Sequence, residues 1–274
     1  MTQVQTTQPR AGEQPVRYTL AFDQLGQRDT EIAGGKGANL GELTRAGFSV
    51  PPGFVLTAKA YLEAMENANL RARLAEVAAT IEPDDPEKLR SVSDELRRAV
   101  REAELPPRIR SALLSAYRAL GKDVLVAVRS SATAEDTAGT SFAGMNETYT
   151  NVRGEEQLIE KVRACWASLW GQRVISYRAA QNLRLEPAIA VVVQRMVNSE
   201  CSGVMFTADP STSDRSRVVI EAAFGLGEVV VSGQVEPDTY VLAKQGPSVL
   251  ESRIGLKSHK LVRGPEGDLR VDLS

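Results

Sequence analysis

Cysteine, histidine and aromatic residues are scarce in this sequence, with two cysteines, one histidine and 5% Phe, Trp and Tyr. Cys165 and Cys201 are too far apart for a metal-binding pair and too few for a disulfide framework. No apolar run reaches the length of about 18 residues that a membrane-spanning helix requires. The polar N-terminus lacks the basic start and apolar centre of a signal peptide. These absences favour a cytoplasmic protein with no membrane partner.

The charges are nearly balanced, with 33 basic and 35 acidic residues and a net charge of −2. A protein that binds nucleic acid through its backbone usually carries a basic excess, so the charge indicates no such partner. The length of 274 residues and the 42% hydrophobic content are sufficient for a full core. We expect one large domain or two closely joined subdomains.

The composition and the predicted secondary structure change along the chain. Residues 1–17 form a polar tail that we expect to be disordered. Residues 18–121 are predicted to be a loop-rich and helical subdomain, with a short helix over 39–45 and further helices between 58 and 121. One of these helices is predicted to begin at Pro86, because Asp85 is a suitable N-cap and proline suits the first helical position.

Residues 122–274 are dominated by predicted strands, interrupted by one amphipathic helix over 155–180. VLVAV at 124–128 is a continuous apolar run, typical of a strand buried on both faces. The pattern indicates an α+β protein with a helical flank and mixed or antiparallel sheets. The other expected strands cover 188–197, 203–207, 217–223, 239–244, 248–254 and 269–273.

The stretch AGGKGANLGEL at 33–43 places Lys36 among glycines just before a predicted helix. It is no P-loop, because Gly37 stands where that motif requires Ser or Thr. Glycines nevertheless allow backbone N–H groups to approach an anion, and a helix N-terminus carries partial positive charge. The stretch therefore fits either a phosphate-binding loop or a plain turn with a solvated lysine.

A second candidate is Arg129, which we expect at the end of the strand in VAVRSSA, ahead of a loop rich in small residues. A guanidinium there can form a forked contact with phosphate oxygens. The alternative is a surface loop in which Arg129 pairs with Glu135 or Asp136.

Gln194 is a third candidate, since it lies inside the apolar strand VVVQRMV and needs partners if it is buried. Its amide could form hydrogen bonds with the edge of an adenine base, or it could face solvent or cap a neighbouring strand.

FGLGEVVVSG at 224–233 begins like a dinucleotide-binding fingerprint, but Val230 stands where the third glycine should be.

Four long stretches resemble one family in their order and spacing. The resemblance is to the N-terminal PEP/pyruvate-binding domain shared by phosphoenolpyruvate synthase, rifampin phosphotransferase and pyruvate phosphate dikinase, and it runs from Leu20 to Leu242. VPPGFVLTAKAY and EPDTYVL favour phosphoenolpyruvate synthase within this group. The stretches are AGGKGANLGELTRAGFSVPPGFVLTAKAY, VAVRSSATAEDTAGTSFAGMNETY, VVVQRMVNSECSGVMFTADP and EAAFGLGEVVVSGQVEPDTYVL.

The resemblance implies an ATP-grasp-like fold and assigns roles to individual residues. Lys36 matches a lysine that contacts the ATP phosphates, and Arg129 matches a catalytic arginine that also binds phosphate. Gly144 and Thr148 match contacts of a glycine-rich lid, in which Met145 replaces a common glutamine, and Gln194 matches an adenine-side contact.

The resemblance also implies ATP and Mg²⁺ as cofactors, with the metal ligands expected beyond Ser274. The implied activity is that of a phosphotransferase, which passes a phosphoryl group from ATP to a carrier histidine and then to pyruvate. The carrier domain and the pyruvate- or antibiotic-binding domain are not in this sequence, and His259 is expected to be structural or solvated. The alternatives are the ATP domain of a rifampin phosphotransferase and a stand-alone, non-catalytic nucleotide-binding module.

Overall fold

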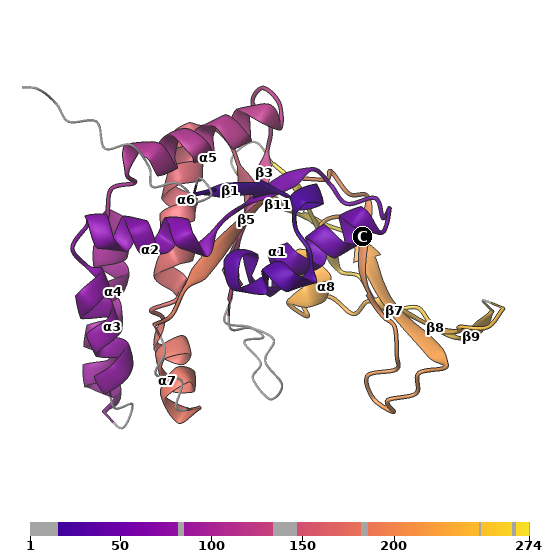
Figure 1. Cartoon of the computed structure of the whole chain (residues 1–274). Coiled ribbons are helices and arrows are strands. Elements are labelled where there is room, and N and C mark those ends of the chain that lie inside the picture. Colours follow the sequence, from indigo (N-terminus) through magenta and orange to yellow (C-terminus); the bar gives the residue numbers. More distant parts are fainter. Residues whose placement is uncertain are drawn as a thin grey trace, which may run out of the picture. The chain divides into compact units, whose positions relative to one another are not determined.

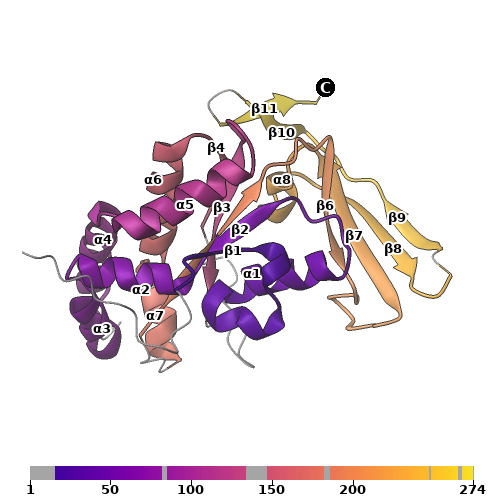
Figure 2. The same cartoon turned by 45° about the horizontal axis from the view of Figure 1, so that its top comes forward.

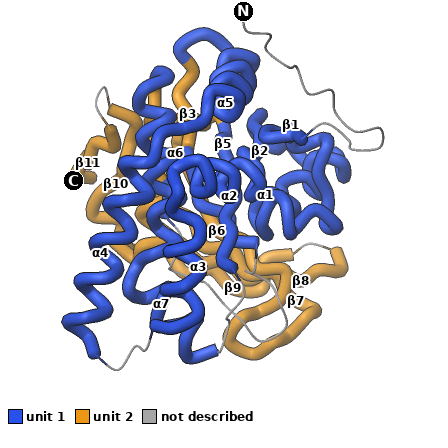
Figure 3. Tube along the Cα trace, turned by 60° about the vertical axis from the view of Figure 1, so that its left-hand side comes forward, with its two compact units in different colours: residues 1–123, 128–148, 154–194 blue, residues 124–127, 149–153, 195–274 orange. Residues whose placement is uncertain are grey.

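The computed structural model describes residues 16–81, 85–133, 147–181, 186–246, 248–264 and 267–273. The chain forms two compact units, coloured separately in Figure 3. Unit 1 comprises residues 1–123, 128–148 and 154–194, and unit 2 comprises 124–127, 149–153 and 195–274. Most of the predicted tail lies outside the described residues. The subdomain boundary expected near residue 121 stays a prediction.

A five-stranded sheet has the order β1-β2-β5-β3-β4. β2 pairs antiparallel with both β1 and β5. The apolar run of β5 is buried along almost its whole length, as a strand covered on both faces requires. The sequence reading did not predict β1, β2 or β4. The strands are β1 (Thr19–Ala21), β2 (Gly53–Leu56), β3 (Val126–Ala132), β4 (Thr148–Val152) and β5 (Ile189–Arg195).

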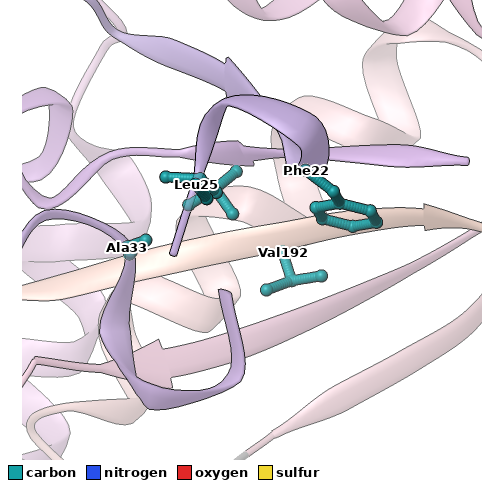
Figure 4. Packing of buried hydrophobic residues seen from close by; sticks show 6 residues of the cluster. Phe22, Leu25, Ala33 and Val192 are labelled. Atoms are coloured by element: carbon teal, nitrogen blue, oxygen red, sulfur yellow. The ribbon is translucent and has the colours of Figure 1, made fainter. Parts of the chain in front are cut away.

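Helix α1 (Thr30–Arg45) packs onto this sheet together with the short helices η1 (Phe22–Gln24) and η2 (Gln27–Asp29). Figure 2 shows α1 beside β1 and β2. The contact is a buried apolar cluster that includes Phe22, Leu25 and Ala33 on this side and Val192 on β5 (Figure 4). Leu43 of this helix is 42% exposed and does not belong to the cluster.

The remaining helices of unit 1 form a separate layer, labelled in Figure 1. The predicted helix over 155–180 is interrupted between Ser168 and Gln172. A second interruption separates α2 from α3 at Asn69, which has a φ of 54°. Buried hydrogen bonds connect the layer: Ser93 Oγ donates to the Trp170 carbonyl at 2.7 Å, and Trp170 Nε1 donates to Tyr61 Oη at 3.0 Å. The helices are α2 (Ala58–Asn67), α3 (Arg71–Thr80), α4 (Pro86–Glu102), α5 (Pro107–Ala119), α6 (Glu155–Ser168) and α7 (Gln172–Ala180).

The predicted start of α4 is confirmed. Asp85 Oδ1 accepts hydrogen bonds from the backbone N–H groups of Glu87 and Lys88, both at 3.0 Å, and Pro86 is the first helical residue. These bonds satisfy two donors that the helix itself leaves without partners.

We expect Asp85→Ala to lower the free energy of unfolding by about 1 kcal/mol, because both capping bonds are lost. Urea denaturation followed by circular dichroism measures the change. Asp94→Ala is the matched control, since Asp94 is an exposed residue inside the same helix and its loss should cost less than about 0.5 kcal/mol. Equal effects of the two substitutions would contradict the capping role.

Unit 2 contains an antiparallel sheet of four strands in the order β6-β7-β8-β9, and an antiparallel hairpin of β10 and β11. Helix α8 (Glu228–Val231) packs through Val229 against Ala223 and Val235. The strands predicted over 203–207, 217–223, 239–244, 248–254 and 269–273 are confirmed, with ends shifted by a few residues. The strands of unit 2 are β6 (Cys201–Phe206), β7 (Arg217–Phe224), β8 (Asp238–Ala243), β9 (Val249–Arg253), β10 (His259–Arg263) and β11 (Asp268–Asp272).

His259 is buried at the start of β10, as its expected structural role requires. Its Nδ1 lies 3.1 Å from Ser258 Oγ, and its Nε2 lies 3.4 Å from Gln234 Oε1. Both ring nitrogens thus have neighbours within unit 2.

In the described part of the chain, no helix is both long and apolar enough to cross a membrane.

Candidate functional site

The glycine-rich stretch forms a break inside α1. Gly34 has φ 68° and ψ 169°, a backbone conformation that essentially only glycine adopts. The helix resumes immediately after it, so Lys36 lies in the first turn of the second helical segment rather than in a loop before residue 39. The positive end of the helix dipole therefore coincides with the lysine. The lysine is half-buried, and the glycines on either side of it are buried.

Ser131 of β3 binds both sides of this break. Its hydroxyl donates to the Ala33 carbonyl at 2.9 Å and accepts from the Gly37 N–H at 3.3 Å. Ser131 is fully buried. The strand that carries Arg129 is therefore in direct contact with the segment that carries Lys36. The sequence reading did not identify Ser131 as a site residue, because its partners are 94 and 98 positions away.

Arg129 lies inside β3, which corrects the expectation that it stands at a strand end. The strand begins at Val126 and continues through Ala132, because Ser130 and Ser131 both find hydrogen-bond partners and can be buried. Side chains two positions apart share a face of a strand, so Arg129 lies on the face of Ser131. The alternative partners Glu135 and Asp136 lie outside the described residues.

Ser130, on the opposite face of β3, holds the residue just before β4. Its hydroxyl accepts from the Glu147 N–H at 2.9 Å, and its own N–H donates to the Glu147 carbonyl at 3.0 Å. The Glu147 carboxylate also lies 3.2 Å from Arg97 Nη2 of α4. Thr148, the next residue, is exposed at the start of β4. Gly144, the other predicted lid contact, lies outside the described residues.

Gln194 is 8% exposed in β5, and its amide donates to the Pro51 carbonyl at 3.2 Å, next to β2. This contact is the capping of a neighbouring strand that the sequence left open as an alternative. An adenine contact by Gln194 stays a prediction.

Cys165 of α6 is a buried cysteine whose thiol is affected by two charged residues of unit 1. Burial raises the pKa of its thiol, the negative charge of Glu147 raises this pKa further, and the positive charge of Lys36 lowers it. The thiol therefore stays protonated at neutral pH.

This geometry defines a class of site within unit 1. A lysine at a helix N-terminus and an arginine on the adjoining strand provide positive charge beside glycines that allow close backbone approach. Such a site suits an anion, and phosphate groups in particular. Among the described residues, no group of three or more His, Cys, Asp or Glu side chains is arranged to hold a metal ion.

Comparison with known proteins shows which family this chain belongs to. The model of the family described as "Pyruvate phosphate dikinase, AMP/ATP-binding domain" matches residues 30–273. The chain therefore belongs to this family of AMP/ATP-binding domains, and the resemblance seen in the sequence is confirmed.

Curated relatives carry the name of phosphoenolpyruvate synthase. A "Probable phosphoenolpyruvate synthase" of Methanothermobacter thermautotrophicus is 46% identical over 258 residues, covering 92% of this chain and 38% of the relative. The "Phosphoenolpyruvate synthase" of Aeropyrum pernix is 42% identical over 264 residues, covering 94% of this chain and 32% of the relative. A further "Probable phosphoenolpyruvate synthase", of Methanocaldococcus jannaschii, is 42% identical, and the match covers 22% of its length. The chain thus spans well under half of the length of these relatives.

Proposed function

We propose that this chain binds ATP at the break in α1 and serves as the nucleotide-binding part of a phosphoenolpyruvate synthase. Lys36 and Arg129 would hold the phosphates, Gly144 and Thr148 would contact them as parts of a lid, and Gln194 would lie on the adenine side. The fold would be an ATP-grasp fold, and the protein would act in the cytoplasm. The observation that carries the proposal is the buried Ser131 hydroxyl, which joins the Lys36 segment to the Arg129 strand.

The roles of the two cations follow from the chemistry of phosphoryl transfer, which depends mainly on positioning and charge neutralisation. Lys36 would act as a point charge at the helix N-terminus, and Arg129 would offer a planar fork to phosphate oxygens. Mg²⁺ would neutralise further phosphate charge.

The phosphoryl acceptor in the whole enzyme would be a carrier histidine, and then pyruvate, in domains outside this sequence. The names of the relatives favour this reading over a rifampin phosphotransferase. A non-catalytic nucleotide-binding module is the remaining alternative for the chain alone.

Calorimetric titration of the chain with ATP, with and without Mg²⁺, tests the proposal. We expect saturable binding of one ATP per chain, tighter than the binding of AMP because each added phosphate meets Lys36 or Arg129. Analysis of the nucleotide after incubation separates a transferase from a binder, since AMP and phosphate appear only if ATP is cleaved. Absence of ATP binding under both conditions would overturn the proposed function.

A further inference from the structure

Ser131 stands out among the buried polar residues of unit 1 because its one hydroxyl serves two separate backbone groups of α1. It donates to the Ala33 carbonyl before the break and accepts from the Gly37 N–H after it. Lys36 lies between these two groups. The hydroxyl thus spans the segment that presents the lysine.

Close packing leaves this segment little freedom to move. A Cβ atom added at Gly34 would lie 2.2 Å from Ser131 Oγ and 2.4 Å from the Ser131 carbonyl oxygen. One added at Gly37 would lie 2.9 Å from Val55 Cγ2 of β2 and 3.0 Å from Ala33 Cβ. Both glycines therefore bring the backbone of α1 into direct contact with neighbouring strands or with the preceding turn.

The residue before the break is anchored in the core. Ala33 is fully buried, and its methyl group belongs to the cluster with Phe22, Leu25 and Val192 shown in Figure 4. The Ser131 hydroxyl binds the carbonyl of this anchored residue. The hydrogen bond therefore connects β3 to a fixed point, and the Gly37 N–H is held relative to that point.

We infer that Ser131 is a positioning residue that sets the separation between the cations at Lys36 and Arg129. Arg129 is two residues away on the same strand face, and Lys36 is one residue from the N–H that Ser131 binds. Two cations at a fixed separation favour a ligand with several phosphate groups over a ligand with one. Ser131 thereby contributes to the preference for ATP over AMP. This inference rests on the proposed function, since it concerns the same site.

The test compares Ser131→Ala with the unchanged chain in titrations with ATP and with AMP. We expect the dissociation constant for ATP to rise about tenfold and that for AMP to change less than about twofold, because AMP does not need both cations at a fixed separation. Ser131→Cys replaces the hydroxyl by a weaker hydrogen-bonding group, and we expect an intermediate ATP affinity. A role in folding alone would not change the ratio of ATP to AMP affinity.

Ser93→Ala is the matched control. Ser93 is also fully buried in unit 1, and its hydroxyl also binds a backbone carbonyl, but it lies in the helical layer on α4. We expect it to lower thermal stability while leaving both dissociation constants unchanged. The inference is overturned if folded Ser131→Ala binds ATP as tightly as the unchanged chain, or if its affinities for ATP and AMP fall equally.

Hydrogen exchange without nucleotide tests, separately from ATP binding, whether the Ser131 hydroxyl holds the two sides of the break in α1 together. In Ser131→Ala, we expect faster exchange in the peptide covering residues 33–38, with no change in α4 outside global unfolding. Unchanged exchange in that peptide would also overturn the inference. If the unchanged chain binds no ATP, the proposed function fails. The exchange result still decides whether Ser131 holds the two sides of the break together.

Discussion

Gly34→Ala is expected to lower the free energy of unfolding by about 4 kcal/mol, as the sum of two costs that are each about 1–3 kcal/mol. The first cost is backbone strain, because φ 68° with ψ 169° is essentially restricted to glycine. The second is overpacking, because the new methyl group would lie 2.2 Å from Ser131 Oγ and 2.4 Å from a backbone oxygen. Since strand β3 is buried, it has little room to move away.

Urea denaturation of Gly34→Ala and of Gly47→Ala measures this difference. Gly47 follows α1 and also has a positive φ, 81°, but an added Cβ there meets no atom within 4 Å. Its substitution should cost only the strain of a left-handed residue, about 1–2 kcal/mol. Similar losses for the two variants would show that contact with Ser131 does not constrain the break. A Gly34→Ala chain too unstable to purify, beside a stable Gly47→Ala chain, agrees with the prediction.

Elements determined by local chemistry could be read from the sequence. Asp85 and Pro86 specify the start of α4 within one turn, and the apolar run over 188–197 predicts the strand β5. The strand β2 was missed, because GFVL is only four residues long and follows two prolines. Its strand conformation depends on pairing with β1 and β5, which are distant in sequence.

The interruption between α2 and α3 also could not be predicted from the local sequence pattern. Leu62 and Leu74 fit one apolar stripe, and yet α2 ends between them, at Asn67, and Asn69 adopts a positive φ before α3 begins. Periodicity identifies the face that packs, but it cannot show a change of direction when apolar residues continue on both sides.

The candidate site was predictable from motif resemblance and only weakly from local chemistry. GGKG alone fits neither a P-loop nor a dinucleotide fingerprint, so a plain turn stayed open as an alternative. The placement of Arg129 was wrong by a few positions, because the sequence gives no sign that two serines extend β3 as buried strand residues. Ser131 was missed, because a serine acquires its role only when the fold brings α1 to it.

Lys36→Ala is expected to weaken ATP binding by about 30-fold, because a charge-assisted hydrogen bond to a phosphate is worth about 1.5–3 kcal/mol. The free energy of unfolding should change by less than about 1 kcal/mol, since alanine is a good helix former and Lys36 lies in the first turn of a helical segment. Lys36→Met, which keeps most of the stem without the charge, should lose as much affinity as Lys36→Ala. Calorimetry with ATP at two salt concentrations measures both the loss and a weaker salt dependence.

Lys59→Ala is the matched control for the lysine. Lys59 is an exposed residue in the first turn of α2 in the same unit, so its loss removes one positive charge from unit 1 at another helix. We expect its ATP affinity to remain within about twofold of the unchanged chain, because water and salt screen the charge of an exposed side chain. If Lys36→Met binds ATP like the unchanged chain, the lysine charge does not contact phosphate. If Lys59→Ala loses as much affinity as Lys36→Ala, net charge rather than this site governs binding, and the assignment of Lys36 is wrong.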